Sequence, residues 1–140
     1  MFQRYFTIAE ANAWLPQVKE LIVHLQSLKR EFEMKMHRLE NISAGTEEAE
    51  RTVLSKEDQF LLEASIDFLD WQAKANIEQF EKEGILIKGV DEGLVDFPAM
   101  INGDVVLLCW RQGEEFMTHY HGVYEGFIGR KSIEDIEDTN

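Results

Sequence analysis

The sequence predicts an α+β protein, with a long antiparallel helical hairpin packed on a small three-stranded antiparallel β-meander. Of its nine glycines, all but Gly45 lie at or after Gly84. Glycine-poor sequence favours helix, whereas glycine-punctuated sequence favours short strands and turns. Apolar residues recur at steps of three and four before Gly84, and an Asn-Gly pair separates two apolar runs after it. These two patterns are typical of amphipathic helices and of a β-hairpin.

The length fits one domain, because 140 residues are enough to bury a core without disulfides or structural metals. We expect the helical hairpin over residues 1–83 and the meander with a glycine-rich C-terminal segment over residues 84–133. The acidic residues 134–140 are expected to form a solvated tail.

The first helix is predicted to begin at Thr7, which forms a capping box with Glu10. Pro16 is expected to end or kink its first turns, so that a short opening helix precedes a long one ending near Leu39. The seam of the long helix has the spacing of a coiled coil, with Lys35 interrupting it. Its apolar positions are Val18, Leu21, Leu25, Leu28, Phe32 and Leu39. The segment from Asn41 to Thr52 is predicted to be a solvated connection.

The second helix is predicted to begin at Ser55 and to end at Gly84. It has two nearly opposite apolar stripes, which need two partners. One stripe contains Leu62, Ile66, Leu69, Ala73 and Phe80, and the other contains Leu61, Ala64, Phe68, Trp71 and Ala75. We expect one stripe to pack on the first helix and the other on the strands or on a second copy of the protein. A homodimer is therefore expected.

Asn102-Gly103 is the preferred sequence of a two-residue hairpin turn, and it pairs Ile101 with Asp104. A second turn at Gln112-Gly113 would place Cys109 opposite Phe116. Because side chains alternate along a strand, this register sorts the residues onto two faces. The face expected to cover the helices carries Val95, Phe97, Ala99, Ile101, Val106, Leu108, Trp110 and Met117, with His119 and His121 at its end. The other, chemically mixed face carries Asp96, Pro98, Leu107, Cys109, Arg111, Glu114, Phe116, Thr118 and Tyr120. Pro98 is expected on an edge strand, where its missing N–H is tolerated.

Charge and cysteine content exclude several classes of protein. The net charge of −13 would repel a phosphate backbone or an anionic lipid surface, so nucleic acid and membrane are not expected as partners. The single cysteine, Cys109, cannot form an internal disulfide, and no apolar run follows a basic segment near the N-terminus. We therefore expect a cytoplasmic protein.

Most of the residues that resemble a known family lie in the C-terminal half of the chain. The resemblance is carried by Lys88, Gly93-Leu94-Val95-Asp96-Phe97-Pro98-Ala99, Leu108-Cys109-Trp110-Arg111, Gly113-Glu114, His121 and Gly126-Phe127-Ile128-Gly129-Arg130, with Phe6-Thr7, Glu10-Ala11-Asn12 and Leu15-Pro16 ahead of them. Together these residues resemble a prokaryotic family known as domain of unknown function 2203. Members usually have Trp before the histidine where this chain has Tyr120, and His119 is not part of the family pattern. The resemblance implies no activity or cofactor.

A metal site is one candidate for the chemistry of the protein. His119 and His121 project to one side of a predicted strand, and Glu125 follows four residues later. Imidazole and carboxylate ligands at this spacing suit Zn, Mn or Fe. The register above puts Asp96 and Cys109 on the opposite face, so a third ligand would have to come from elsewhere. The alternative is that both histidines are packed or lie at the solvent edge.

A second candidate site combines Asp96, Arg111, Glu114, His121 and Arg130. The simplest interpretation of Asp96, Arg111 and Glu114 is an ion-pair network, because the planar guanidinium suits carboxylates. The alternative is an anion-binding pocket in which Arg111 and Arg130 act with the backbone N–H groups of residues 126–130. Cys109 is expected to be buried and inert, although Arg111 on the same face would favour a thiolate.

Two functions therefore stay open. In the first, the protein is a non-enzymatic interaction or scaffold module that self-associates through its helices. In the second, it binds a metal ion or an anionic metabolite on the mixed face and the Gly126–Arg130 loop, with or without catalysis. No reaction, and so no enzyme class, follows from the sequence.

Overall fold

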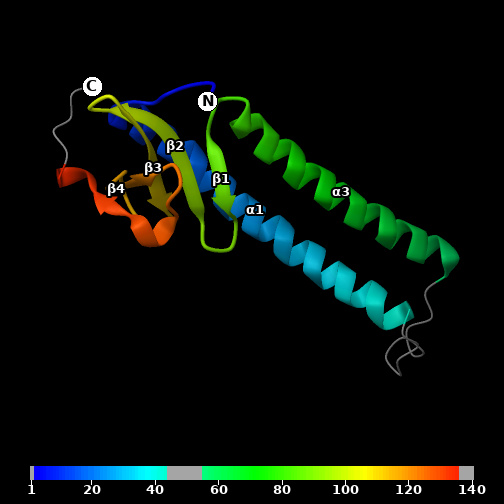
Figure 1. The fold of residues 1–140 in the computed structure, drawn as a ribbon. Helices are drawn as coiled ribbons and strands as arrows, with labels where there is room; N and C mark the ends of the chain where they lie inside the picture. The colour runs from blue at the N-terminus through cyan, green and yellow to red at the C-terminus, as the bar shows by residue number, and fades with distance from the viewer. Residues whose placement is uncertain (1, 44–54, 136–140) are drawn as a thin grey trace. The chain divides into compact units, whose positions relative to one another are not determined.

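A computed structural model describes residues 2–43 and 55–135 (Figure 1). The chain forms two compact units, one of Met1–Val23 with Ile77–Asn140 and one of His24–Asn76. The helices α1 and α3 each contribute to both units. A single domain stays a prediction. The α+β class is confirmed, because two long helices accompany an antiparallel sheet.

Helix α1 runs from Ile8 to Ser43, and its start is as predicted. The N–H of Thr7 donates to Glu10 Oε1 (3.1 Å), and the N–H of Glu10 donates to Thr7 Oγ1 (3.0 Å). The predicted break at Pro16 is wrong, because Pro16 lies inside one continuous helix. Proline removes one backbone hydrogen bond there, and burial of the apolar face around it keeps the helix intact. The helix continues through Ser43, and the rest of the predicted connection lies outside the described residues.

Helix α3 runs from Lys56 to Glu81. Its N-cap is confirmed, since Ser55 Oγ accepts the N–H of Asp58 at 3.1 Å. Gly84 follows the helix with a φ of 88°, a left-handed conformation that glycine adopts at no steric cost.

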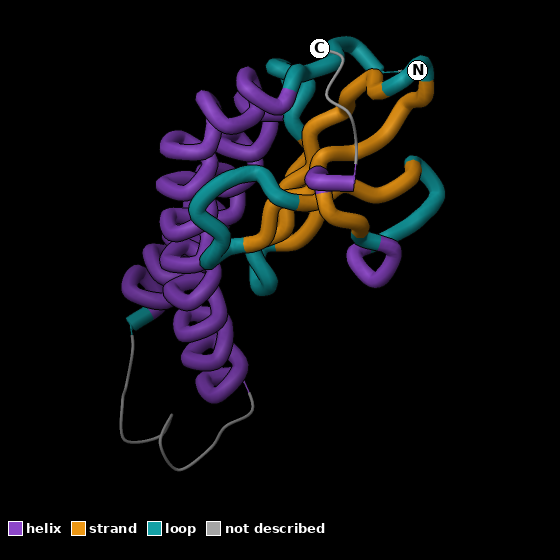
Figure 2. Tube along the Cα trace, turned by 90° about the vertical axis from the view of Figure 1, so that its left-hand side faces the viewer, coloured by secondary structure: helices purple, strands orange, loops and turns teal. Residues whose placement is uncertain are grey.

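In the unit His24–Asn76, α1 and α3 lie side by side and run in opposite directions (Figures 1 and 2). Leu25 and Leu28 of α1 are buried, as are Ile66 and Leu69 of α3. The Lys35 ammonium donates a hydrogen bond to Ser65 Oγ and lies 3.2 Å from Glu31. The polar interruption in the seam is therefore satisfied by partners on both helices.

The sheet has five strands in the order β1-β2-β3-β4-β5, all antiparallel, rather than the three expected (Figure 2). The strands are β1 (Leu86–Gly89), β2 (Leu94–Ile101), β3 (Asp104–Arg111), β4 (His119–Gly122) and β5 (Lys131–Ser132). The two unexpected strands, β1 and β5, are four and two residues long. Runs this short show almost no alternation in sequence.

The first hairpin turn is confirmed. Asn102 and Gly103 have φ angles of 52° and 83°, and Ile101 faces Asp104. The pairing then continues without a shift to Leu94 and Arg111, so Asp96 faces Cys109 as predicted.

The predicted register of the next pair of strands is wrong. Cys109 faces His119 rather than Phe116, a shift of three residues. The loop before β4 is held by contacts to α1, in which Asn12 Oδ1 accepts the N–H of Met117 (2.7 Å) and Lys19 donates to the Glu115 carbonyl (2.9 Å). An odd shift exchanges the two faces of a strand. His119 and His121 therefore lie on the mixed face, and Tyr120 packs against the core instead.

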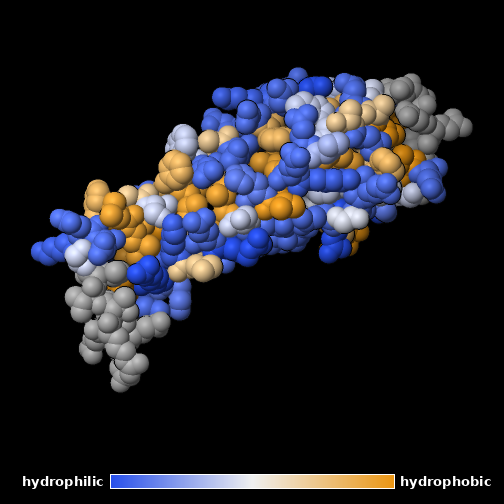
Figure 3. Space-filling model, turned by 180° about the vertical axis from the view of Figure 1, so that it is seen from behind, coloured by the Kyte–Doolittle hydropathy of each residue, from blue (hydrophilic) through white to orange (hydrophobic). Residues whose placement is uncertain are grey.

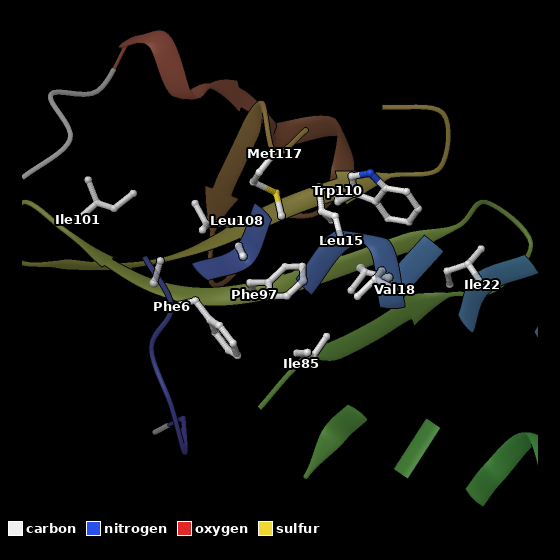
Figure 4. Packing of buried hydrophobic residues seen from close by; sticks show 13 residues of the cluster. Phe6, Leu15, Val18, Ile22, Ile85, Phe97, Ile101, Leu108, Trp110 and Met117 are labelled. Carbon is white, nitrogen blue, oxygen red and sulfur yellow. The ribbon is translucent and has the colours of Figure 1, made fainter. Parts of the chain in front are cut away.

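The other face of the sheet forms the core with the first turns of α1, as predicted (Figure 4). The largest buried side chains of this core include Trp110, Phe97, Leu108 and Val95 from the sheet, Leu15, Val18 and Ile22 from α1, and Phe6 ahead of α1. Phe6 and Phe97 meet edge to face with ring centroids 5.3 Å apart. Met117 is part of this core although it lies in a loop.

Strand β2 is not at the sheet edge, so the expected reason for Pro98 is wrong. The shorter β1 pairs with β2 only between Leu94 and Asp96, so no residue of β1 lies opposite Pro98 and its missing N–H costs no hydrogen bond to β1. The Pro98 carbonyl on that side accepts the N–H of Phe6 at 2.7 Å. The register of β1 shifts between Ile87 and Gly89, so Lys88 is the extra residue of a bulge.

Within residues 2–43 and 55–135, no helix is both long and apolar enough to cross a membrane.

Candidate metal centre

Three neighbouring strands bring a carboxylate, a thiol and an imidazole together on the mixed face, and all three are groups of the kinds that bind metal ions. Asp96 of β2 faces Cys109 of β3, and His121 of β4 faces Leu107, one side-chain position further along the same face. One donor atom from each of the three side chains lies within 4.8 Å of the other two. All three residues are buried. The sheet itself therefore sets the spacing of a carboxylate, a thiol and an imidazole.

Both ring nitrogens of His121 have partners. Nδ1 lies 2.8 Å from the Gly122 carbonyl oxygen, and Nε2 lies 3.0 Å from Asp96 Oδ2. Because a carbonyl oxygen only accepts hydrogen bonds, Nδ1 must carry a proton. Nε2 is then the nitrogen that can bind a metal ion, with the ring oriented by a backbone acceptor as is usual for histidine ligands.

Burying the Asp96 carboxylate costs free energy, because its charge is taken out of water. Its residue is only 2% exposed, and Oδ1 has no hydrogen-bond partner of normal geometry in the described part of the chain. Burial raises the pKa of this carboxyl, and the nearby His121, the Cys109 thiol and Lys88 offset that rise only in part. A cation beside Oδ1 would remove the cost of burying this oxygen.

Cys109 is a protonated thiol in the absence of a metal ion. Burial raises its pKa to about 12, and the Asp96 carboxylate contributes to that rise. Both ring nitrogens of His121 have other partners, and the Asp96 carboxylate beside the thiol favours its protonated form. The arrangement is unlike that of a cysteine nucleophile and suits a thiol that releases its proton to solvent when a metal ion binds the sulfur.

A cavity of about 180 Å³ opens onto these three side chains. Its other walls come from β1, β2, β3 and the segment after β4: Lys88, Leu94, Leu107, Val123, Glu125, Gly126 and Phe127. A metal ion held by three protein groups would keep a position open toward this space, as catalytic rather than structural zinc sites do.

Beside this cavity, Glu114 and Arg130 form an ion pair in which one guanidinium nitrogen contacts both carboxylate oxygens. Arg130 Nη2 lies 2.6 Å and 2.8 Å from the two carboxylate oxygens of Glu114. The Arg111 N–H also donates to Glu114 Oε1 (2.6 Å). Although burial raises the pKa of Glu114, the hydrogen bonds from Arg130 and Arg111 outweigh it, and the net result is a lowered pKa.

The five residues predicted for an anion site thus form two separate groups. Asp96 pairs with His121, and Glu114 pairs with Arg130. The guanidinium carbons of Arg111 and Arg130 lie 5.2 Å and 4.7 Å from the centre of the Phe127 ring. Arg130 is committed to a carboxylate and an aromatic ring. The expected ion-pair network of Asp96, Arg111 and Glu114 is wrong, because Glu114 pairs with Arg130 and Arg111 reaches Glu114 only through its backbone N–H.

Of the three residues predicted as metal ligands, the structure places only His121 in the cluster of donor atoms. His119 Nδ1 lies 2.8 Å from Thr118 Oγ1 and 3.5 Å from Glu114 Oε2. Glu125 lines the cavity, but its Oε1 accepts the N–H of Gly122 at 3.1 Å and lies 3.9 Å from Lys131. The predicted register placed Asp96 and Cys109 together but put His121 on the wrong face. The loop between Arg111 and His119 is longer by an odd number of residues than a tight turn at Gln112-Gly113, and no local pattern in the sequence shows this.

A match to a family described as an uncharacterized conserved protein (DUF2203) covers residues 4–133. No curated protein and no solved structure matches the chain. The match spans nearly the whole chain, so the protein belongs to this family, whose function is not established.

Proposed function

We propose that this member of the DUF2203 family is a metal-binding protein whose ligands are Asp96, Cys109 and His121. The observation that carries the proposal is the convergence of three buried donor atoms from three adjacent strands within 4.8 Å of one another. The unpartnered Asp96 Oδ1 supports it, because buried oxygens without a partner are rare and costly.

The donor set favours a transition metal over Mg²⁺ or Ca²⁺. Thiolate and imidazole ligands suit Zn²⁺, Fe²⁺ and Co²⁺, whereas Mg²⁺ and Ca²⁺ take oxygen ligands. Zn²⁺ is the first ion to test, because one sulfur, one nitrogen and one oxygen ligand fit its usual chemistry. A reducing compartment such as the cytoplasm would keep Cys109 available as a thiol.

Metal content tests this function directly. Purified protein is stripped with a chelator, loaded with Zn²⁺, desalted and analysed for zinc, and we expect one ion per chain. Cys109→Ser and His121→Gln should each lose the stoichiometric ion, while circular dichroism shows that both variants fold. Co²⁺ should give a thiolate charge-transfer band in the wild type but not in Cys109→Ser.

His119→Gln is the matched control, because it removes a histidine two residues away on the same face. It should keep the ion, as should Glu125→Gln. Loss of zinc in these two variants with retention in Cys109→Ser would favour the His119, His121 and Glu125 set instead. Wild-type protein without stoichiometric metal would contradict the proposal.

A second candidate function is self-association as a homodimer, and the exposed stripe of α3 favours it. Leu61, Phe68 and Trp71 are 62%, 59% and 63% exposed, and the last two rings stack with centroids 5.9 Å apart. Exposed hydrophobic surface is also visible in the space-filling view (Figure 3). Large apolar side chains left in water are typical of interfaces.

The stripe is complementary to itself. An antiparallel two-fold pairing of α3 centred on Phe68 places Leu61 opposite Ala75 of a second copy, so a large residue meets a small one on each side of the axis. Phe68→Glu should give a monomer in light scattering, while Met34→Glu, at another exposed apolar position, should not change the mass. A wild-type monomer at micromolar concentration would rule out this function.

A further inference from the structure

We infer that the cavity over the proposed metal centre binds a small carboxylate with a short apolar chain, which takes the open metal position and pairs with Lys88. This inference rests on the proposed function and adds the class of ligand. It is carried by the charge balance of the site and by the size and chemistry of the cavity walls.

When a divalent ion is bound, two positive groups at the cavity have no ion pair among the described residues: Lys88, which lines it, and Arg111, whose guanidinium carbon lies 5.2 Å from the centre of the Phe127 ring in the cavity wall. The ionised Asp96 and Cys109 neutralise the ion. Glu114 is paired with Arg130, and Glu125 lies 3.9 Å from Lys131. Lys88 lines the same cavity, and no described residue forms an ion pair with it. The site therefore fits an anionic ligand.

The position of Lys88 follows from the bulge in β1, because the bulge leaves this residue as an unpaired member of the strand beside Leu94. Lys88 lines the same cavity as Asp96, Cys109 and His121, which puts it beside the proposed ligands. A bulge next to a site commonly re-aims one side chain. An anion bound to the metal ion would thus have a second positive partner at the cavity wall.

The size and walls of the cavity narrow the ligand further. The volume of about 180 Å³ is below the usual range for drug-sized ligands. Leu94, Leu107 and Val123 give apolar surface next to the charged groups. Inorganic phosphate needs several donors and offers no apolar contact, whereas a carboxylate of about four carbons uses both kinds of wall.

The experiment uses full-length protein loaded with Co²⁺, whose visible d–d bands report changes in its ligands. Butyrate should shift these bands with saturation. Inorganic phosphate should need at least about tenfold higher concentration, and butylammonium should have no effect. Lys88→Gln should weaken butyrate binding about tenfold without changing the cobalt stoichiometry, which corresponds to the loss of one charged hydrogen bond.

Three further variants sharpen the result. Lys88→Arg should restore butyrate binding in large part, and Lys82→Gln, which removes the same charge outside the cavity, should leave it unchanged. Val123→Thr should reduce the preference for butyrate over acetate.

The failures are distinguishable. If Co²⁺ binds with its thiolate band but butyrate does not shift the d–d bands, this inference is wrong and the metal site stands. The same holds if phosphate competes equally with butyrate or if Lys88→Gln binds like the wild type. If Co²⁺ does not bind, both proposals fall.

Discussion

The two faces of the sheet bury different kinds of side chain although they share the same strands. The face toward α1 is apolar, and its central residues Phe97, Leu108 and Trp110 are almost fully buried. The opposite face buries Asp96, Cys109 and His121 just as deeply. Burial of apolar surface stabilises the fold, whereas burial of a carboxylate without full hydrogen bonding costs free energy. One face therefore explains why the chain folds, and the other calls for a functional explanation.

The largest effect is expected from truncation on the apolar face. Phe97→Ala should reduce the free energy of unfolding by about 3–5 kcal/mol, because it removes a buried ring and leaves a cavity. Urea unfolding followed by circular dichroism measures this loss. Cys109→Ser on the opposite face should cost much less in metal-free protein, and equal losses would contradict the division of roles between the faces.

The next effect is stabilisation of the polar face by metal. Zinc at a hundredfold excess over its Kd should raise the free energy of unfolding of the wild type by about 2.7 kcal/mol, because it binds only the folded state. Asp96→Asn should show almost no zinc-dependent stabilisation. A thermal shift of equal size in both proteins would place the ion elsewhere.

The ion pair beside the site should contribute a smaller and pH-dependent amount. Glu114→Gln should lose about 2 kcal/mol at neutral pH, because it weakens charged hydrogen bonds to Arg130. Since the folded protein lowers the pKa of Glu114, this stabilisation is present above the unfolded pKa of about 4.3 and is lost as the pH falls through the folded value. Urea unfolding at pH 7 and pH 3 should show the difference between variant and wild type shrinking in acid, and a difference independent of pH would refute this account.

The smallest effect is expected far from the site, at the start of α1. Thr7→Ala should cost about 1 kcal/mol, because it removes the hydrogen bond to the Glu10 N–H. The variant should keep its zinc stoichiometry. A change in zinc content would mean that the helix start and the metal site are coupled.

The two turns of the meander show what the sequence can and cannot predict. The turn at Asn102-Gly103 is determined by local backbone preference, and from it the pairing of all eight residues of β2 follows. The loop after Arg111 is determined by distant partners, since Asn12 and Lys19 of α1 hold residues 115 and 117. Local rules contain no information on such contacts, and an error of three residues moved His121 to the wrong face.

The same distinction explains the helices and the candidate site. Thr7 and Ser55 start helices through hydrogen bonds within four residues, so their caps were predictable. The effect of Pro16 depends on the burial of the helix around it, which the local pattern does not contain. Asp96 and Cys109 were predicted to lie together because their strands are joined by the turn at Asn102-Gly103. The third donor, His121, lies on β4, and its position depends on the loop after Arg111.

The bulge at Lys88 also affects how copies of the protein can meet. Strand β1 is one edge of the sheet, and an edge with regular unpaired backbone groups invites pairing with another chain. A lysine at an irregular position discourages such pairing, and the two-residue β5 leaves little backbone exposed on the opposite edge. Regular pairing of a second chain along β1 is therefore disfavoured, which lowers the risk of sheet-to-sheet aggregation at this edge.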